Sequence, residues 1–299
     1  MIAGATAVGK SEVALEVAER LGGEIVIADS RQVYRGLDIG TAKPSAAERA
    51  RVPHHLLDVV DVGERYTAAD YARGARVALR AIEERGRLGI LCGGTGFYLA
   101  ALAGSLDALT AASTQARARL AAVPDEARHA TLAEVDPAIA ARLHPRDRQR
   151  VDRALVFWYE TGEPLSSCQR GGEAPLLHVA VALTRRRDEV MARLETRLDR
   201  MLEAGLEAEA RGFWEAGRMP ADPGIDTIGY QEWWPYFEGE IGREEVRRRI
   251  LVATRRYAKR QGTWFRHQGE YRQLAAGAGA EAVIAVWSSR LERAVERAR

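Results

Sequence analysis

The stretch GATAVGKS, residues 4–11, decides the fold class of this chain. Its spacing of Gly4, four residues, Gly9, Lys10 and Ser11 is that of a phosphate-binding loop. The two glycines allow a tight turn whose N–H groups point inward at an anion. Lys10 can reach the outer phosphates, and the Ser11 hydroxyl can bind Mg²⁺. We therefore predict a diphosphate or nucleotide site with Ser11 as its metal ligand, formed by Gly4, Ala5, Thr6, Ala7, Val8, Gly9, Lys10 and Ser11.

The segments around this loop fit a strand, a loop and a helix. Residues 11–21 carry apolar side chains at positions 13, 14, 17, 18 and 21, which is helical spacing. The amino end of such a helix favours an anion. Only Met1–Ala3 precede the loop, so the strand that leads into it is expected to be short.

Alternating strands and helices continue through the first half of the chain. Residues 23–30 form an apolar run that ends in Asp29 and Ser30, residues 65–86 read as a helix, and residues 88–98 run into the glycine turn GGTG. This order predicts a parallel sheet with helices on its faces and ligands at the carboxyl ends of its strands. Asp29, Thr95 and the phosphate-binding loop are therefore expected to lie together.

A helical insertion interrupts this pattern at residues 113–143, where Ala, Arg and Glu dominate and strand patterns are absent. We assign residues 1–112 and 144–299 to the catalytic core. Within the latter range we expect a helix over 146–162, a strand over 176–183 and helices over 185–217 and 243–265. The glycine- and alanine-rich stretch 275–282 is expected to be a loop.

Composition narrows the functional classes. The 299 residues carry a net charge of +2, two cysteines and no apolar run of ~20 residues, so a membrane span and a disulfide framework are excluded. We expect a cytoplasmic monomer. Residues 243–272 contain ten Lys or Arg against three Glu, which favours a polyanionic partner. Lys10, Lys43 and Lys259 are the only lysines, so each is a candidate for a role that arginine cannot fill.

Candidate catalytic residues stand at two strand ends. Asp29 can accept a proton or bind Mg²⁺, and the long loop 29–44 that follows it is too elaborate for a simple connection. Thr95 supplies a hydroxyl in a turn whose glycines allow a substrate to approach the backbone. His54 and His55 have no partner set typical of a metal site and are expected to orient their loop.

Eight motifs in register resemble the bacterial tRNA dimethylallyltransferases (tRNA isopentenyltransferases), a family with P-loop kinase-like ancestry. They are GATAVGKS, DSRQVYRGLDIGTAKP, PHHLLDV, RYTAADY, GGTGFYLAAL, HPRDRQRVDRAL, IGYQEWWPYFEGEI and ATRRYAKRQGTWFR. The resemblance runs from Ala3 to about Arg266. The sequence departs from the family at Ala5 and Val8 of the loop, and at Gln231 and Glu232, where Arg-Gln is frequent.

The resemblance implies a transfer of the dimethylallyl group from its diphosphate to N6 of adenosine 37, beside the tRNA anticodon, with Mg²⁺ as cofactor. It implies that Asp29 takes a proton from the adenine amine and that Thr95 lies beside the reacting centre. It also implies tRNA contacts by Asp29, Ser30, Arg31, Gln32, Thr95, Arg117, Gln149, Arg150, Val151, Asp152, Arg153, Lys259 and Arg260.

The residues alone leave three alternatives open. An ATP-dependent small-molecule kinase fits the loop and the parallel sheet, although the basic third of the chain argues against it. A prenyltransferase acting on free adenylate would share the chemistry without needing an RNA surface. A non-catalytic RNA-binding protein could use the loop to gate a conformational state.

Overall fold

The computed structural model describes residues 1–104, 113–168, 178–268 and 270–298. The chain divides into two compact units, of which the first comprises residues 1–66, 70–99 and 177–299, and the second residues 67–69 and 100–176. The second unit is larger than the predicted insertion of 113–143. It reaches further because the helix that follows residue 143 packs against the helices of the insertion.

The first unit is built on a six-stranded sheet in the order β3-β2-β4-β1-β5-β6, in which every pair of neighbours is parallel. The α/β fold class with a parallel sheet is thus confirmed. The strands are β1 (Ile2–Gly4), β2 (Glu24–Ile27), β3 (His54–His55), β4 (Gly89–Gly93), β5 (Val181–Thr184) and β6 (Arg272–Ala275).

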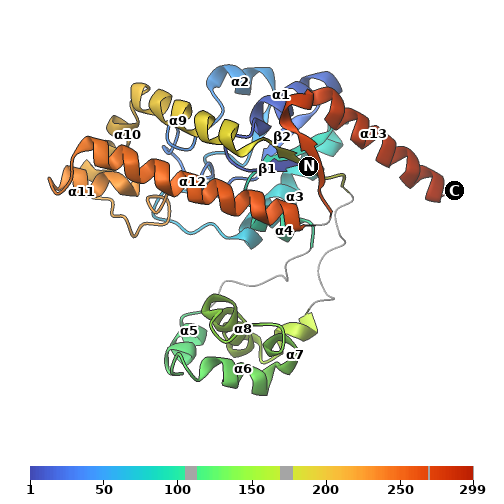
Figure 1. The fold of residues 1–299 in the computed structure, drawn as a ribbon. Helices are drawn as coiled ribbons and strands as arrows, with labels where there is room; N and C mark the ends of the chain where they lie inside the picture. The colour runs from blue at the N-terminus through green and yellow to red at the C-terminus, as the bar shows by residue number, and fades with distance from the viewer. Residues whose placement is uncertain (105–112, 169–177, 269, 299) are drawn as a thin grey trace. The chain divides into compact units, whose positions relative to one another are not determined.

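Helices cover this sheet and enclose its core. One cluster joins β1, β2, β4 and β5 to α1 and α13 through buried side chains such as Val17, Ile90 and Trp287. Helices α9 and α12 lie side by side in Figure 1 and meet through Leu194 and Ala258. The helices of this unit, with α3 and α4 at its boundary, are α1 (Lys10–Leu21), α2 (Ala46–Arg51), α3 (Ala68–Glu84), α4 (Gly96–Leu102), α9 (Arg187–Glu203), α10 (Leu206–Glu215), η2 (Gln231–Trp233), α11 (Trp234–Phe237), α12 (Arg243–His267), η3 (Ala276–Ala278) and α13 (Gly279–Ala298).

Two sequence predictions differ from the structure here. The stretch 275–282, predicted as a loop, instead contains the end of β6, a 3-10 turn and the start of α13. The strand is only four residues long and pairs with β5 at the sheet edge, so its sequence pattern is weak. The helix predicted over 185–217 is two helices, because Gly205 adopts φ 102° and ends the first of them. The first residues of the strand predicted over 176–183 lie outside the described residues.

The second unit is helical in its described residues. Its helices are α5 (Thr114–Ala121), α6 (Arg128–Val135), α7 (Pro137–Ala140), α8 (Arg148–Thr161) and η1 (Leu165–Cys168). Leu132 and Ile139 pack against Val151 and Leu155 of α8 in one core. The side chains of Ser113, Asp136 and Asp147 cap the helices that follow them, as short polar residues at helix starts usually do. Among the described residues, no helix is long and apolar enough to cross a membrane.

Candidate active site

The phosphate-binding loop connects β1 to the first turn of α1. Gly4 has φ 144°, and a Cβ atom there would lie 2.7 Å from the carbonyl oxygen of Leu183 in β5. Gly9 begins the helix with φ 107°. Both positions therefore require glycine, because a side chain would clash or strain the backbone. The Ser11 side chain is exposed on the first turn of α1, where the amino end of the helix attracts anions.

Cations surround this loop. Lys10 Nζ donates to Ala5 O at 2.7 Å. Burial lowers the pKa of the Lys10 amine, and the nearby carboxylate of Asp29 opposes that shift. From α9, Arg197 Nη1 donates to Thr6 Oγ1 at 3.3 Å, and Arg193 Nε donates to Ala7 O at 2.9 Å. Sequence reasoning missed these two arginines, since nothing local separates them from the other arginines of the chain.

Asp29, Ser30 and Thr95 lie together at the ends of β2 and β4. The N–H of Ser30 donates to Thr95 Oγ1 at 3.0 Å, and the N–H of Thr95 donates to Ala28 O at 3.1 Å. Asp29 Oδ1 accepts the N–H of Arg31 at 2.9 Å, while Oδ2 has no hydrogen-bond partner among the described residues. Asp29 and Thr95 thus lie at neighbouring strand ends, as the sequence predicted; their catalytic roles stay predictions.

Helix α12 supplies a tyrosine to the same place, which sequence reasoning also missed. Burial raises the pKa of Tyr257 to about 12; the charge of Asp29 adds to the shift, and a hydrogen bond with Thr95 opposes it. Tyr257 is therefore neutral at physiological pH and lies close to both predicted catalytic residues. From the sequence, α12 is predicted only to contact RNA.

Hydrogen bonds within the loop and to α10 hold the loop after Asp29. Gln32 is buried, and its Nε2 donates to Thr41 O at 3.0 Å and to Ala42 O at 3.1 Å. The backbone N–H groups of residues 38, 39 and 40 all donate to the carboxylate of Glu209 from α10. For Gln32, predicted to contact tRNA, the described side-chain bonds are therefore structural.

Lys43 is the centre of a second set of bonds in this loop. Its side chain is 3% exposed, and Nζ donates to Tyr34 O at 2.7 Å, Asp38 Oδ1 at 2.6 Å and Asp58 Oδ1 at 2.5 Å. All three ammonium protons have acceptors, which a planar guanidinium could not match. Lys43 is thus a structural lysine.

Replacing Lys43 with Met is expected to lower the free energy of unfolding by about 1.5 kcal/mol, because Tyr34 O and two partly exposed carboxylates lose their charged hydrogen-bond donor. Chemical denaturation with urea measures this change. Lys259→Met is the matched control: that lysine is exposed, and its loss should change the free energy by no more than about 0.5 kcal/mol. Equal effects of the two substitutions would show that Lys43 does not support the loop.

In the second unit, the residues predicted to contact tRNA divide into two groups. Arg117, Gln149, Arg150 and Arg153 have exposed side chains. Val151 is 1% exposed in the helical core, and Asp152 Oδ2 accepts from Arg128 Nη1 at 2.9 Å. We therefore correct the prediction for the side chain of Val151, which packs in the core of this unit. Asp152 is partly exposed, and its contact with tRNA stays a prediction.

The basic charge of α12 is also divided. In its first half, Arg248 and Arg249 bind Glu245, and Arg247 binds Asp199 at 2.7 Å. In its second half, exposed cations have no acidic partner among the described residues and recur at helical spacing on one side. This basic face consists of Arg256, Lys259, Arg260 and Arg266.

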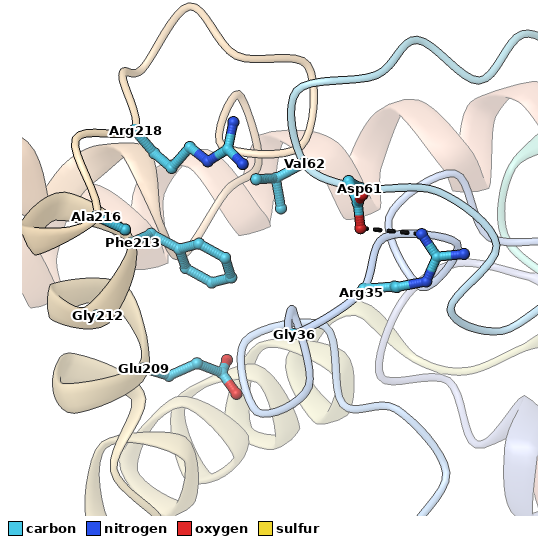
Figure 2. Close-up of a pocket in the computed structure, with 9 residues that line it drawn as sticks. All are labelled: Arg35, Gly36, Asp61, Val62, Glu209, Gly212, Phe213, Ala216 and Arg218. Carbon is cyan, nitrogen blue, oxygen red and sulfur yellow. Dashed lines mark hydrogen bonds and ion pairs between the residues drawn. The ribbon is translucent and has the colours of Figure 1, made fainter.

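A cavity of about 380 Å³ lies elsewhere in the first unit (Figure 2). Phe213 points into it, and across from it Arg35 Nη1 pairs with Asp61 Oδ1 at 2.9 Å. None of the predicted site residues lines this cavity, although all of them are described. We therefore do not assign this cavity as the candidate active site, which is formed by the phosphate-binding loop and the ends of β2 and β4.

These features define a class: α/β proteins with a phosphate-binding loop, in which a carboxylate and a hydroxyl stand beside the loop at the carboxyl ends of parallel strands. A family profile described as IPP transferase matches residues 32–268. The chain belongs to the IPP transferase family.

Individual relatives agree with this assignment. The tRNA dimethylallyltransferase of Halorhodospira halophila is 48% identical over 292 residues, which span 95% of this chain and 94% of the relative. The crystal structure of the tRNA isopentenylpyrophosphate transferase of Bacillus halodurans is similar with a TM-score of 0.71 at 35% identity, covering 98% of both chains. A eukaryotic dimethylallyltransferase acting on tRNA is similar with a TM-score of 0.80 at 29% identity, covering 92% of this chain and 73% of that one.

Proposed function

We propose that this chain transfers the dimethylallyl group from dimethylallyl diphosphate to N6 of adenosine 37 in tRNA and releases diphosphate. The observation that carries the proposal is the juxtaposition of the phosphate-binding loop with Asp29 and Thr95 at neighbouring strand ends. A tRNA substrate supports a cytoplasmic location.

The loop holds the leaving group. As the bond between carbon and the diphosphate oxygen breaks, negative charge grows on the diphosphate. Lys10, Arg197 and the amino end of α1 are placed to stabilise that charge. The exposed Ser11 hydroxyl fits Mg²⁺, which commonly takes one or two protein ligands and fills its other positions with water and phosphate oxygens. When bound, the ion would neutralise part of the leaving-group charge.

Asp29 prepares the nucleophile. The lone pair of an exocyclic adenine amine is delocalised into the ring, so the amine attacks poorly on its own. The free Oδ2 of Asp29 can accept an N6 proton as the new carbon–nitrogen bond forms, which raises the nucleophilicity of the amine. Thr95 and Ser30, joined by their hydrogen bond, hold the acceptor side of the site.

The acceptor base must leave its stack in the anticodon loop to reach Asp29. Phosphate contacts then have to hold the rest of the RNA. The basic face of α12, with Lys259 and Arg260, supports this part of the proposal, as does the exposed side chain of Arg117. The predicted contacts of Arg31, which is half-buried and donates to Pro223 O, and of Arg150, which pairs with Asp147, are weaker support. The unpaired cations of that face offer charge that no carboxylate of the described chain already neutralises.

One assay tests the proposal. The protein is incubated with Mg²⁺, labelled dimethylallyl diphosphate and either unmodified tRNA or AMP, and a parallel reaction contains labelled ATP. Label in tRNA supports the proposal. Label in AMP alone would assign a free-nucleotide prenyltransferase, and cleavage of the terminal phosphate of ATP without prenyl transfer would assign a kinase.

The double substitution Lys259→Ala and Arg260→Ala is expected to weaken tRNA binding and to reduce the slope of log K against log salt concentration by about 2, since each lost phosphate contact lowers the slope by about 1. Filter binding at several salt concentrations measures the slope. Arg248→Ala with Arg249→Ala is the control on the same helix, because both arginines are bound to Glu245. A slope that changes equally in both pairs would contradict the proposed basic face.

A further inference from the structure

Gln261 of α12 joins the two loops of the site through a single side-chain amide. Its Oε1 accepts the N–H of Thr6 in the phosphate-binding loop at 2.8 Å, and its Nε2 donates to the carbonyl oxygen of Gly94 at 2.8 Å. The side chain is buried, at 7% exposure. Because one partner is a donor and the other an acceptor, only one orientation of the amide satisfies both.

The position of this amide relative to the sheet explains why it is needed. Strands β1 and β4 pair in parallel, and the last residues in register are Ala3 and Gly93. Beyond that pair β4 ends, and β1 continues only to Gly4, which pairs with Leu183 of β5. The two segments then continue as separate loops. The Gln261 amide has the donor and acceptor of a peptide group, and it bridges the loops just after backbone pairing has ended.

The absence of a side chain at Gly94 makes room for the Gln261 amide. A Cβ atom at this position would lie 2.4 Å from Gln261 Nε2, which is far inside van der Waals contact. The next residue is Thr95, whose hydroxyl binds the N–H of Ser30. The amide therefore acts directly on the backbone that presents Thr95. One consequence is that the N–H of Thr6 is already engaged and does not point at a bound phosphate.

We propose that Gln261 is a positioning residue that fixes the separation between the bound diphosphate and the Thr95–Asp29 end of the site. This inference rests on the proposed function. Transfer requires the diphosphate oxygen, the prenyl carbon and the adenine amine to be in line, and a displacement of about 1 Å can lower a rate ~10²-fold. Diphosphate binds mainly through the phosphate-binding loop and tRNA mainly through the exposed basic face of α12, so their separate affinities should change much less than the rate of transfer between them.

The test compares two glutamine-to-glutamate substitutions. Gln261→Glu keeps the length and the acceptor for Thr6 but places a carboxylate oxygen against Gly94 O. Gln273→Glu is a control at a more exposed glutamine, since Gln273 Nε2 also donates to a backbone carbonyl, that of Phe265 at 3.0 Å, with no described bond to either loop. We expect the single-turnover transfer rate at saturating substrates to fall about 100-fold in Gln261→Glu and less than about 2-fold in the control. The dissociation constants of inorganic diphosphate and tRNA should stay within about 3-fold of wild type.

A second variant keeps the inference testable if Gln261→Glu unfolds. Gly94→Ala displaces the amide from the other side of the contact, so its loss of rate and that of Gln261→Ala should combine less than multiplicatively in the double variant. Multiplicative losses, an unchanged saturated rate, or a weakening of diphosphate binding as large as the loss of rate would each overturn the inference. If the wild-type protein transfers no label to tRNA, the proposed function fails instead.

Discussion

Replacing Asp29 with Asn is expected to slow prenyl transfer by about 10³-fold at saturating substrates, within the range that a general base contributes. Asparagine keeps an oxygen that can accept the N–H of Arg31, so the turn after β2 is preserved. It removes the negative charge and the basic oxygen that would take the N6 proton. Single-turnover measurements with labelled dimethylallyl diphosphate and tRNA report this rate.

Two comparisons make the Asp29 result specific. The affinity for tRNA should stay within a few-fold of wild type, because one carboxylate contributes little to a contact dominated by phosphates. Asp61→Asn is the control, since that carboxylate is paired with Arg35 at the surface and lies outside the candidate site. Near-normal transfer by Asp29→Asn would remove Asp29 from its assigned role.

Replacing Lys10 with Met is expected to lower the rate of transfer by about 10²–10³-fold, the effect typical of losing one preorganised donor to a developing negative charge. Methionine fills the space of the lysine stem but carries no ammonium group. The affinity for inorganic diphosphate should fall as well, and tRNA affinity should not. Competition between inorganic diphosphate and dimethylallyl diphosphate measures the first of these affinities.

Lys10→Arg separates charge from shape at this position. The guanidinium keeps the charge but is planar and larger than an ammonium, so we expect it to restore only part of the rate. Full activity in Lys10→Met, or unchanged diphosphate affinity, would show that the loop does not bind the leaving group through this lysine.

The parts of the fold and site that could be predicted from the sequence rest on local patterns. The loop is a contiguous motif, and Asp29 and Thr95 each end an apolar strand, so the geometry of a parallel sheet brings them together. The helix over 146–162 could also be predicted, because a glycine marks its end in the sequence. In the structure Gly162 adopts the left-handed conformation that ends α8.

The remaining site residues depend on contacts between distant segments. Arg197 is one of many arginines, and only the packing of α9 brings it to Thr6. Tyr257 and Gln261 reach the site from α12, more than 160 residues beyond Thr95. Lys43 stands out in the sequence as one of three lysines, but its partner Asp58 lies 15 residues away, so no local pattern indicates that its role is structural.

The carboxylate of Glu209 has a consequence for how the enzyme chooses its phosphates. Three consecutive backbone N–H groups in the loop after Asp29 donate to this carboxylate, and a set of amides arranged in this way can bind an anion. Because the Glu209 carboxylate occupies these amides, they cannot bind the diphosphate in competition with the phosphate-binding loop. They also cannot bind an RNA phosphate in the wrong register.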